Sequence, residues 1–244
     1  MKLVVGRLLE TGHRVESLLV NEASFRALDA SLSRLPPDVP VYICETDEFA
    51  AITGFNLHRG CLALAERPAD RPLRNVVRRA DLLLVLEAVT DADNVGSAFR
   101  NAAAFGASVV LSEACCDPLY RKAIRTSMGS VLRTPYARMN EWPHDLAVLK
   151  SEGFTVVALT PREDAIDLPA CARRQPRPST RSGRPELVEG RQRMALLVGS
   201  EGPGLTAAAE AMADVCVRIP ISTDVDSLNL ATATGIALYY FANS

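Results

Sequence analysis

The segment DLLLVLEAVTDADNVGSAFRNAAAFGASVVLSE (81–113) holds two continuous apolar runs, at 81–89 and 107–113, with a helical pattern between them. Continuous apolar runs of this length are typical of strands that are buried on both faces of a sheet. Helical patterns also separate the later runs, which predicts an α/β fold with a mostly parallel sheet. The later apolar runs lie at 155–160, 194–200 and 215–221.

The composition is that of an ordinary globular protein with a sizeable core. The 244 residues are 48% apolar and 23% charged, and the net charge is −2. The bulk charge therefore gives no sign of a nucleic-acid partner, and any basic surface must be local. Because the apolar runs are too short to cross a bilayer and no signal-peptide pattern is present, we expect a cytoplasmic protein that does not contact a membrane.

Two classes of site are disfavoured by missing motifs. The six cysteines and three histidines are scattered, without a CxxC pair or a zinc-ligand spacing. We therefore expect free thiols in a reducing compartment and no metal site. No GxGxxG motif follows any predicted strand, which argues against a dinucleotide-dependent dehydrogenase.

The chain divides into two predicted domains. Short strand and helix patterns alternate over 14–66, which indicates a small α/β domain at residues 1–70. The Arg- and Pro-rich residues 71–80 indicate a linker, either a solvated connector or a basic segment that touches a polyanion. The second domain spans 81–244, and within it the Arg- and Pro-rich residues 171–193 predict a flexible insertion, either without function or helping to hold RNA.

The helix after the first buried strand carries a cation beside its packed face. We expect Asn94 as its N-cap, and Gly96 leaves room for another backbone or a ligand. Arg100 lies about 100° around the helix from Phe99. It is either a surface arginine over apolar neighbours or a cation that reaches a crevice at the strand ends, where α/β sheets bind ligands. The predicted packed stripe is Phe99, Ala102, Ala103 and Gly106.

Two later segments also follow strands with unusual residues. LLVGSEGPGL (196–205) is a glycine-rich turn that exposes backbone groups, with the carboxylate of Glu201 among them. IPISTDVDSLNLATATG (219–235) starts a helix for which Asp226 or Ser227 is the expected cap. Capping does not explain why Asn229 and so many small residues follow.

Two helices are predicted with explicit ends or faces. DPLYRKAIRTSMG (117–129) should begin with Asp117 as cap and Pro118 in the first helical position, and end at Gly129. The last helix is predicted at 227–242. Its expected packed face is Leu228, Ala231, Ile236, Tyr239 and Tyr240.

Together, three separated segments resemble, in order, the signature motifs of the SpoU/TrmH family of SPOUT RNA ribose 2′-O-methyltransferases. Ala92 stands where the family often has proline, and the resemblance covers about residues 80–244. Residues 14–66 resemble the L30e-like RNA-binding domain that many members carry in front, with its first helix shortened. The matching segments are NVGSAFRNA (94–102), LLVGSEGPGL (196–205) and RIPISTDVDSLNLATATG (218–235), supported by YRKAIRTSMGSVLRTPY (120–136).

The resemblance implies a SPOUT-type, mostly parallel sheet with a C-terminal deep trefoil knot, preceded by the small L30e-like α/β domain. It implies a homodimer with the active site beside the interface, for which the apolar C-terminal helix is a suitable contact surface. It also implies that S-adenosylmethionine binds in the knotted loops, mainly to backbone groups. By position these belong to Leu159, Thr160, Gly199, Ile219 and Leu228.

The family's polar active-site positions fall on five residues. A guanidinium is a poor base because its pKa lies above about 12, so Arg100 is expected to grip the substrate phosphate and stabilise the developing alkoxide. The other four would hold Arg100 and the loop in place, or orient the ribose and the cofactor. These five are Asn94, Arg100, Glu201, Ser227 and Asn229; Asn94 and Glu201 are the expected holders, Ser227 and Asn229 the orienting groups.

The resemblance favours an S-adenosylmethionine-dependent methyltransferase that acts on a ribose 2′-hydroxyl of rRNA or tRNA. The alternative is a non-catalytic RNA-binding protein that retains the fold. The presence of Arg100 and of Ser227-Leu228-Asn229 favours the enzyme.

Overall fold

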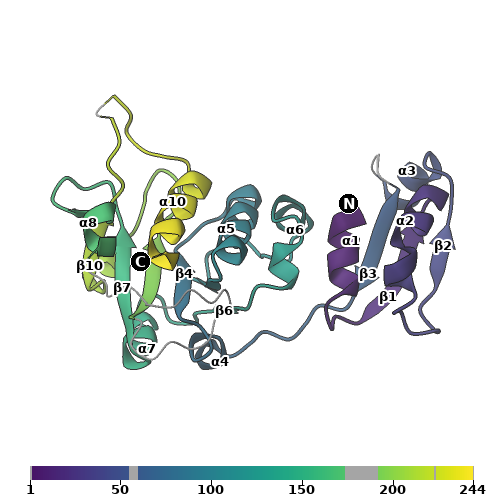
Figure 1. The fold of residues 1–244 in the computed structure, drawn as a ribbon, viewed down its shortest axis with the longest axis horizontal. Coiled ribbons are helices and arrows are strands. Elements are labelled where there is room, and N and C mark those ends of the chain that lie inside the picture. Colours follow the sequence, from purple (N-terminus) through teal and green to yellow (C-terminus); the bar gives the residue numbers. More distant parts are fainter. Residues whose placement is uncertain (1, 55–59, 174–191, 223, 244) are drawn as a thin grey trace.

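The computed structural model describes residues 2–54, 60–173, 192–222 and 224–243, which form two sheets with their helices (Figure 1). The predicted α/β class is confirmed, and the larger sheet is parallel throughout. The trefoil knot and the domain boundaries stay predictions. The insertion predicted at 171–193 falls almost entirely on residues outside the described ranges. Within those ranges, no helix has the length and hydrophobicity that a bilayer crossing needs.

The N-terminal part is a three-stranded sheet. Strand β1 (Val15–Val20) lies in the middle, parallel to β2 (Val41–Ile43) and antiparallel to β3 (Cys61–Ala65). Asn21 caps the second helix, since its Oδ1 accepts from the Ser24 amide at 2.8 Å. The alternation predicted over 14–66 is confirmed, and the L30e-like assignment stays a prediction. The helices are α1 (Lys2–Leu9), α2 (Glu22–Leu32) and α3 (Glu48–Thr53).

The second sheet has seven strands in the order β6-β5-β4-β9-β7-β10-β8. Alternate residues of its strands enter two different apolar clusters, with Leu84 in one and Leu83 in the other. This sheet is therefore buried on both faces, as its apolar runs predict. All five predicted strands are confirmed, and the two that were missed have only three and two residues. The strands are β4 (Leu82–Leu86), β5 (Ser108–Leu111), β6 (Tyr136–Arg138), β7 (Phe154–Leu159), β8 (Ile166–Asp167), β9 (Arg193–Val198) and β10 (Val215–Arg218).

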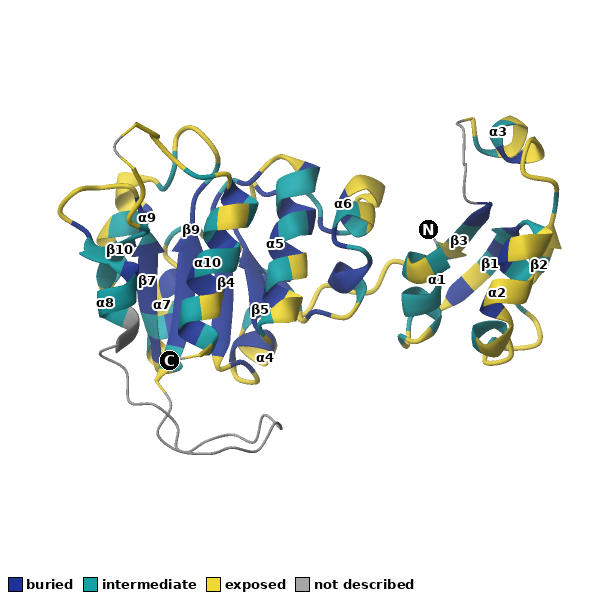
Figure 2. Cartoon of the chain, turned by 45° about the horizontal axis from the view of Figure 1, so that its top comes forward, coloured by how far each residue is buried: buried dark blue, intermediate teal, exposed yellow. Residues whose placement is uncertain are grey.

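Helices cover both faces of this sheet, and its strands are the most deeply buried part of the chain (Figure 2). One cluster joins the sheet to α5 and α10, and the other joins it to α4 and α7. The helices of this part are α4 (Leu73–Val77), α5 (Ala92–Ala104), α6 (Arg121–Thr126), α7 (Leu146–Ser151), α8 (Leu168–Arg173), α9 (Ala207–Ala211) and α10 (Leu230–Ala242), with one 3-10 turn, η1 (Ser130–Leu132).

The start predicted for the helix at 117–129 is wrong. Asp117 Oδ1 accepts from the Leu119 amide at 2.9 Å and closes a turn before the helix. Helix α6 then begins at Arg121, with Tyr120 as its N-cap. The Asp117 carboxylate thus binds the amide of a residue two positions later and does not cap the helix.

The packed face predicted for the last helix is only partly confirmed: Ile236 and Tyr240 pack against the core, whereas Tyr239 is 56% exposed. Most sides of α10 are apolar, so hydrophobicity alone does not select the packed side. Polar contacts with α5 contribute, because Asn101 Nδ2 donates to the Ala231 carbonyl (2.6 Å) and to Thr234 Oγ1 (3.0 Å). The buried residues of α10 are Leu230, Thr234, Ala237, Leu238 and Phe241.

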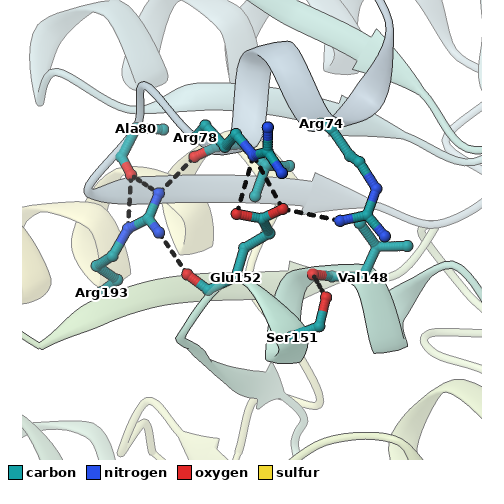
Figure 3. A network of polar contacts seen from close by, with 8 residues as sticks. Arg74, Arg78, Ala80, Val148, Ser151, Glu152 and Arg193 are labelled. Atoms are coloured by element: carbon teal, nitrogen blue, oxygen red, sulfur yellow. Dashed lines mark hydrogen bonds and ion pairs between the residues drawn. The ribbon is translucent and has the colours of Figure 1, made fainter.

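Residues 71–80, expected as a linker, include helix α4 with Val76 and Val77 buried. Its arginines are engaged within the protein. Arg74 and Arg78 bind the Glu152 carboxylate at 2.8 and 3.1 Å, beside the end of α7 (Figure 3). These two side chains are therefore not free for the polyanion contact that we considered.

The same contacts set the charge state of Glu152. Partial burial would by itself raise the pKa of this carboxyl, but the hydrogen bonds from Arg78 and Arg74 outweigh it and hold the pKa below its ordinary value. Since the pKa is lowered on folding, this contribution to stability is present at neutral pH. It is lost in acid, as the pH falls below the ordinary glutamate pKa of about 4.3 and through the folded value.

Arg193, at the start of β9, joins three segments through its guanidinium. It donates to the carbonyls of Val77, Ala80 and Glu152 (Figure 3). The group also lies over the Phe154 ring, 4.1 Å from its centroid. One side chain thus satisfies three carbonyls from two other parts of the chain at this edge of the sheet.

Replacing Arg193 with methionine should lower the free energy of unfolding by about 2–4 kcal/mol, because several charge-assisted hydrogen bonds are lost together. Denaturant titration followed by circular dichroism measures the change. The matched control is Arg79→Met, an exposed arginine without a side-chain partner among the described residues, for which a change within about 0.5 kcal/mol is expected. Equal stabilities of the two variants would contradict this assignment.

Candidate active site

A cavity of about 400 Å³ lies at the carboxyl ends of β7, β9 and β10. Its walls come from the segments that follow these three strands, which parallel strands bring to one edge of the sheet. All five residues predicted to bind the cofactor line it, together with three of the five predicted catalytic residues. These are Leu159, Thr160, Gly199, Ile219 and Leu228 from the first set, and Glu201, Ser227 and Asn229 from the second.

The glycine-rich loop after β9 folds back on itself. The Gly204 amide donates to the Ser200 carbonyl at 3.0 Å, and Gly202 and Gly204 have φ values of 85° and 72°, which favour glycine. A Cβ on Gly199 would lie 2.1 Å from the Gly204 carbonyl carbon. The loop thus needs glycine at 199 because two stretches of backbone touch there.

Glu201 connects this loop to the start of the last helix. The Asn229 side-chain amide donates to Glu201 Oε1 at 2.8 Å, and the Leu230 amide approaches the same oxygen at 3.4 Å. Asn229 is also the N-cap of α10, since its Oδ1 accepts from the Ala231 amide at 2.9 Å. The expectation that Asp226 or Ser227 caps this helix is therefore wrong. The N-cap is Asn229, whose presence the two expected caps did not explain.

Arg100 and Asn94 are not among the residues that line the cavity. Arg100 is exposed on α5 and has no hydrogen bond or ion pair with the described residues. The contact that we expected between Glu201 and Arg100 is absent, because Glu201 binds Asn229 instead. The structure thus unites the second and third sequence motifs and places Arg100 apart from them.

The N-cap predicted for α5 is wrong by three residues. Asp91 is the cap, with its Oδ1 accepting from the amides of Asp93 (2.7 Å) and Asn94 (3.0 Å). The aspartate precedes Asn94 and meets the capping requirement first, which leaves the Asn94 side chain available for another role.

The packed stripe of α5 is shifted toward its start. Phe99 and Ala102 are buried as predicted, whereas Ala103 and Gly106 are exposed. Gly96 does allow a close backbone approach, since an added Cβ would lie 2.7 Å from the Ala123 carbonyl oxygen of α6. The additional buried positions are Ala92, Val95, Gly96 and Ala98.

Asp93 strengthens the contact between α5 and α6. Thr126 Oγ1 donates to its carboxylate at 2.6 Å, and Lys122 pairs with it at 2.9 Å. The hydrogen bond from Thr126, followed by that from Lys122, holds the pKa of Asp93 below its ordinary value. The helix that carries Arg100 is therefore fixed at its first turn as well as at its packed face.

Arg162 does not line the cavity but adjoins its wall in the chain, and its ion pairs were not predicted. It follows Pro161 of the cavity wall and pairs with Asp164 (2.6 Å) and with Glu210 of α9 (3.3 Å). Hydrogen bonds from the guanidinium to Asp164 and then to Glu210 raise the pKa of Arg162. Glu210 lies 48 residues after Arg162, so no local sequence pattern predicts this pair.

In the described ranges, no three His, Cys, Asp or Glu side chains are grouped as a metal ion would need. All six cysteines are free thiols.

Two bacterial RNA methyltransferases are similar to this chain over most of its length. An uncharacterized tRNA/rRNA methyltransferase from Mycobacterium tuberculosis is 44% identical over 217 residues, which is 86% of this chain and 70% of that protein. A 23S rRNA (guanosine(2553)-2′-O)-methyltransferase from Bacillus subtilis is 28% identical, over 96% of this chain and 87% of that protein.

Solved structures share the fold. The S-adenosylmethionine-bound rRNA methyltransferase from Sinorhizobium meliloti has a TM-score of 0.76 and 26% identity, covering 99% of this chain and 84% of that one. The SpoU methyltransferase AviRb from Streptomyces viridochromogenes has a TM-score of 0.77 at 23% identity, covering 99% and 86%. The SpoU rRNA Methylase family matches residues 81–239, and the chain belongs to that family.

Proposed function

We propose that this RNA methyltransferase of the SpoU family transfers a methyl group from S-adenosylmethionine to a ribose 2′-hydroxyl of rRNA or tRNA. The observation that carries the proposal is the cavity in which the loops after β7, β9 and β10 meet, with Glu201 bound to Asn229 at its rim. The ribose target is taken from relatives such as the Bacillus subtilis 2′-O-methyltransferase.

The cavity suits S-adenosylmethionine in size and in chemistry. Ligand pockets of this type measure roughly 300–1,000 Å³, and this one measures about 400 Å³. The side chains of Leu159, Ile219 and Leu228 give it apolar walls for an adenine ring, and the close backbone at Gly199 offers main-chain groups. When bound, the cofactor supplies an electrophilic methyl group on a sulfonium.

The polar residues of this chain would position the RNA and stabilise charge. Ser227 and Asn229 lie at the cavity and would orient the ribose, while Glu201 holds Asn229 in place. A guanidinium is a poor base, so Arg100 would bind the neighbouring phosphate bidentately and stabilise the developing alkoxide instead of removing the proton. Asn94 would act beside it, on the same helix.

A homodimer is part of the proposal. Arg100 lies outside the cavity of its own chain, so an active site at the interface of two copies would use its exposed position. On α10, next to α5, the ring of Tyr239 stacks edge-on against Phe105 at 6.1 Å and remains 56% exposed. An exposed aromatic surface of this kind suits a subunit contact.

Incubation with labelled S-adenosylmethionine and unmodified rRNA or tRNA should yield a methylated product that resists alkaline cleavage at one nucleotide. A 2′-O-methyl group removes the nucleophile of that cleavage, whereas a methylated base leaves it in place. Site mapping in RNA from cells with and without the gene then identifies the nucleotide. Base-methylated product would refute the ribose target, and binding of RNA without any methyl transfer would favour the non-catalytic alternative.

Arg100→Ala should lower the rate of methyl transfer about 10²-fold or more, because a charge-stabilising donor is lost. The dissociation constant for S-adenosylmethionine should stay unchanged, since Arg100 does not line the cavity. Single-turnover assays and calorimetry measure the two quantities, with Arg79→Ala as the exposed-arginine control. An unchanged rate would remove Arg100 from the mechanism.

Gly199→Ala should weaken S-adenosylmethionine binding about 10-fold or more, because the new methyl group forces the loop away from Gly204. Calorimetric titration measures the affinity, and a thermal melt shows whether the fold survives. Gly12→Ala is the control, as its added Cβ would meet nothing within 4 Å. Equal affinities for the variant and the wild type would contradict the placement of the cofactor in this cavity.

A further inference from the structure

Glu87 is a buried carboxylate outside the lining of the cavity. It follows β4 at the carboxyl edge of the sheet and is 2% exposed. Among the described residues it forms no ion pair, yet three donors reach its two oxygens. A carboxylate is costly to bury unless its oxygens are satisfied, so this arrangement indicates a specific requirement for a carboxylate here.

Glu87 contacts both ends of the glycine-rich loop. Its backbone amide donates to the carbonyl of Val198, the residue before Gly199, at 2.9 Å. Its carboxylate accepts from the Thr206 amide (2.8 Å) and the Thr206 hydroxyl (2.7 Å), just after the loop. Glu87 therefore restrains Val198 and Thr206, the two residues that flank the loop at 199–205.

Thr206 carries this restraint into the next helix. It is the N-cap of α9, and its Oγ1 accepts from the Ala209 amide at 3.2 Å. The same hydroxyl thus donates to Glu87 and caps a helix. The end of the loop cannot move without loss of both contacts.

The position of Glu87 itself is fixed from outside the loop. Trp142 Nε1 donates to Glu87 Oε1 at 2.6 Å from the segment before α7. The next residue, Ala88, has a φ of 51° and donates its amide to Ser112 Oγ at 2.9 Å. A left-handed conformation at a non-glycine residue persists only where its surroundings enforce it, so Glu87 is presented by a rigid turn.

We propose that Glu87 is a positioning residue for the cofactor loop, whose carboxylate holds residues 199–205 in the conformation that binds S-adenosylmethionine. The inference rests on the proposed function. Glu87 does not line the cavity, and it acts through Thr206 on the loop that carries Gly199 and Glu201. Without this restraint the loop populates other conformations. The apparent affinity for S-adenosylmethionine then falls in proportion to the fraction of molecules whose loop keeps the binding conformation.

The test compares Glu87→Gln with wild type in S-adenosylmethionine binding and in steady-state kinetics. The amide of glutamine replaces one acceptor oxygen with a donor. Its remaining oxygen can keep the two donors that reach Oε1, but the Thr206 backbone amide, which donates to Oε2, loses its acceptor. We expect a dissociation constant about 10-fold higher or more, and a KM for S-adenosylmethionine that rises more than kcat falls. Glu87→Asp keeps the carboxylate and should recover part of the affinity.

Two partner variants separate positioning from general stability. Thr206→Val removes the hydroxyl that donates to Glu87 and caps α9, and keeps the Thr206 backbone amide. It should weaken binding in the same way as Glu87→Gln. Trp142→Phe removes the donor outside the loop, and it should lower the melting temperature with little change in the dissociation constant. The Thr206 variant also keeps the proposal testable if Glu87→Gln does not fold.

The outcomes distinguish this inference from the proposed function. If wild-type protein does not bind S-adenosylmethionine, the proposed function fails. If wild type binds, and Glu87→Gln or Thr206→Val binds equally well, the positioning role is refuted. A loss of affinity in Trp142→Phe as large as in Thr206→Val would assign Glu87 to fold stability instead.

Discussion

Helices cover both faces of the parallel sheet, and this burial leaves the edges of the sheet as the places where a cavity can open. Because the strands are parallel, their carboxyl ends share one edge, and the loops after β7, β9 and β10 meet there although they are far apart in sequence. The Glu201–Asn229 hydrogen bond joins two of these loops. The cavity is thus a consequence of strand direction, completed by one polar contact.

The two edges of the sheet use buried or half-buried polar groups differently. At the amino edge, Arg193 satisfies carbonyl groups that helix ends leave open, and Glu152 is paired with two arginines. At the carboxyl edge, Glu87 is satisfied by neutral donors, and two of them belong to the end of a cavity loop. The first set joins elements of the scaffold, whereas the second determines the shape of a site.

The sequence predicts those parts of the structure that depend on local pattern. The five buried strands follow from apolar runs, and the turn at 196–205 follows from its glycines. The N-cap of α5 was misplaced because two capping residues, Asp91 and Asn94, compete within one turn. The packed side of α10 was only partly predicted because it is selected by Asn101, which lies 130 residues earlier.

The sequence also predicts only part of the candidate site. The five cofactor residues predicted from motif positions all line the cavity, and four of them lie at or directly after the end of a strand. Glu87 gives no such signal: it is one acidic residue after an apolar run, and its partners Trp142 and Thr206 are distant in the chain. Long-range hydrogen bonds of this kind have no periodicity that a single sequence reveals.

Asn101 has a consequence beyond the packing of two helices. It is the neighbour of Arg100 on α5, and its amide binds the first turns of α10, the helix that Asn229 caps. The backbones that carry Arg100 and Asn229 are therefore spaced by the interior of the protein. The entropy of aligning the two helices is lost during folding, so a ligand that contacts both of them would not lose it again on binding.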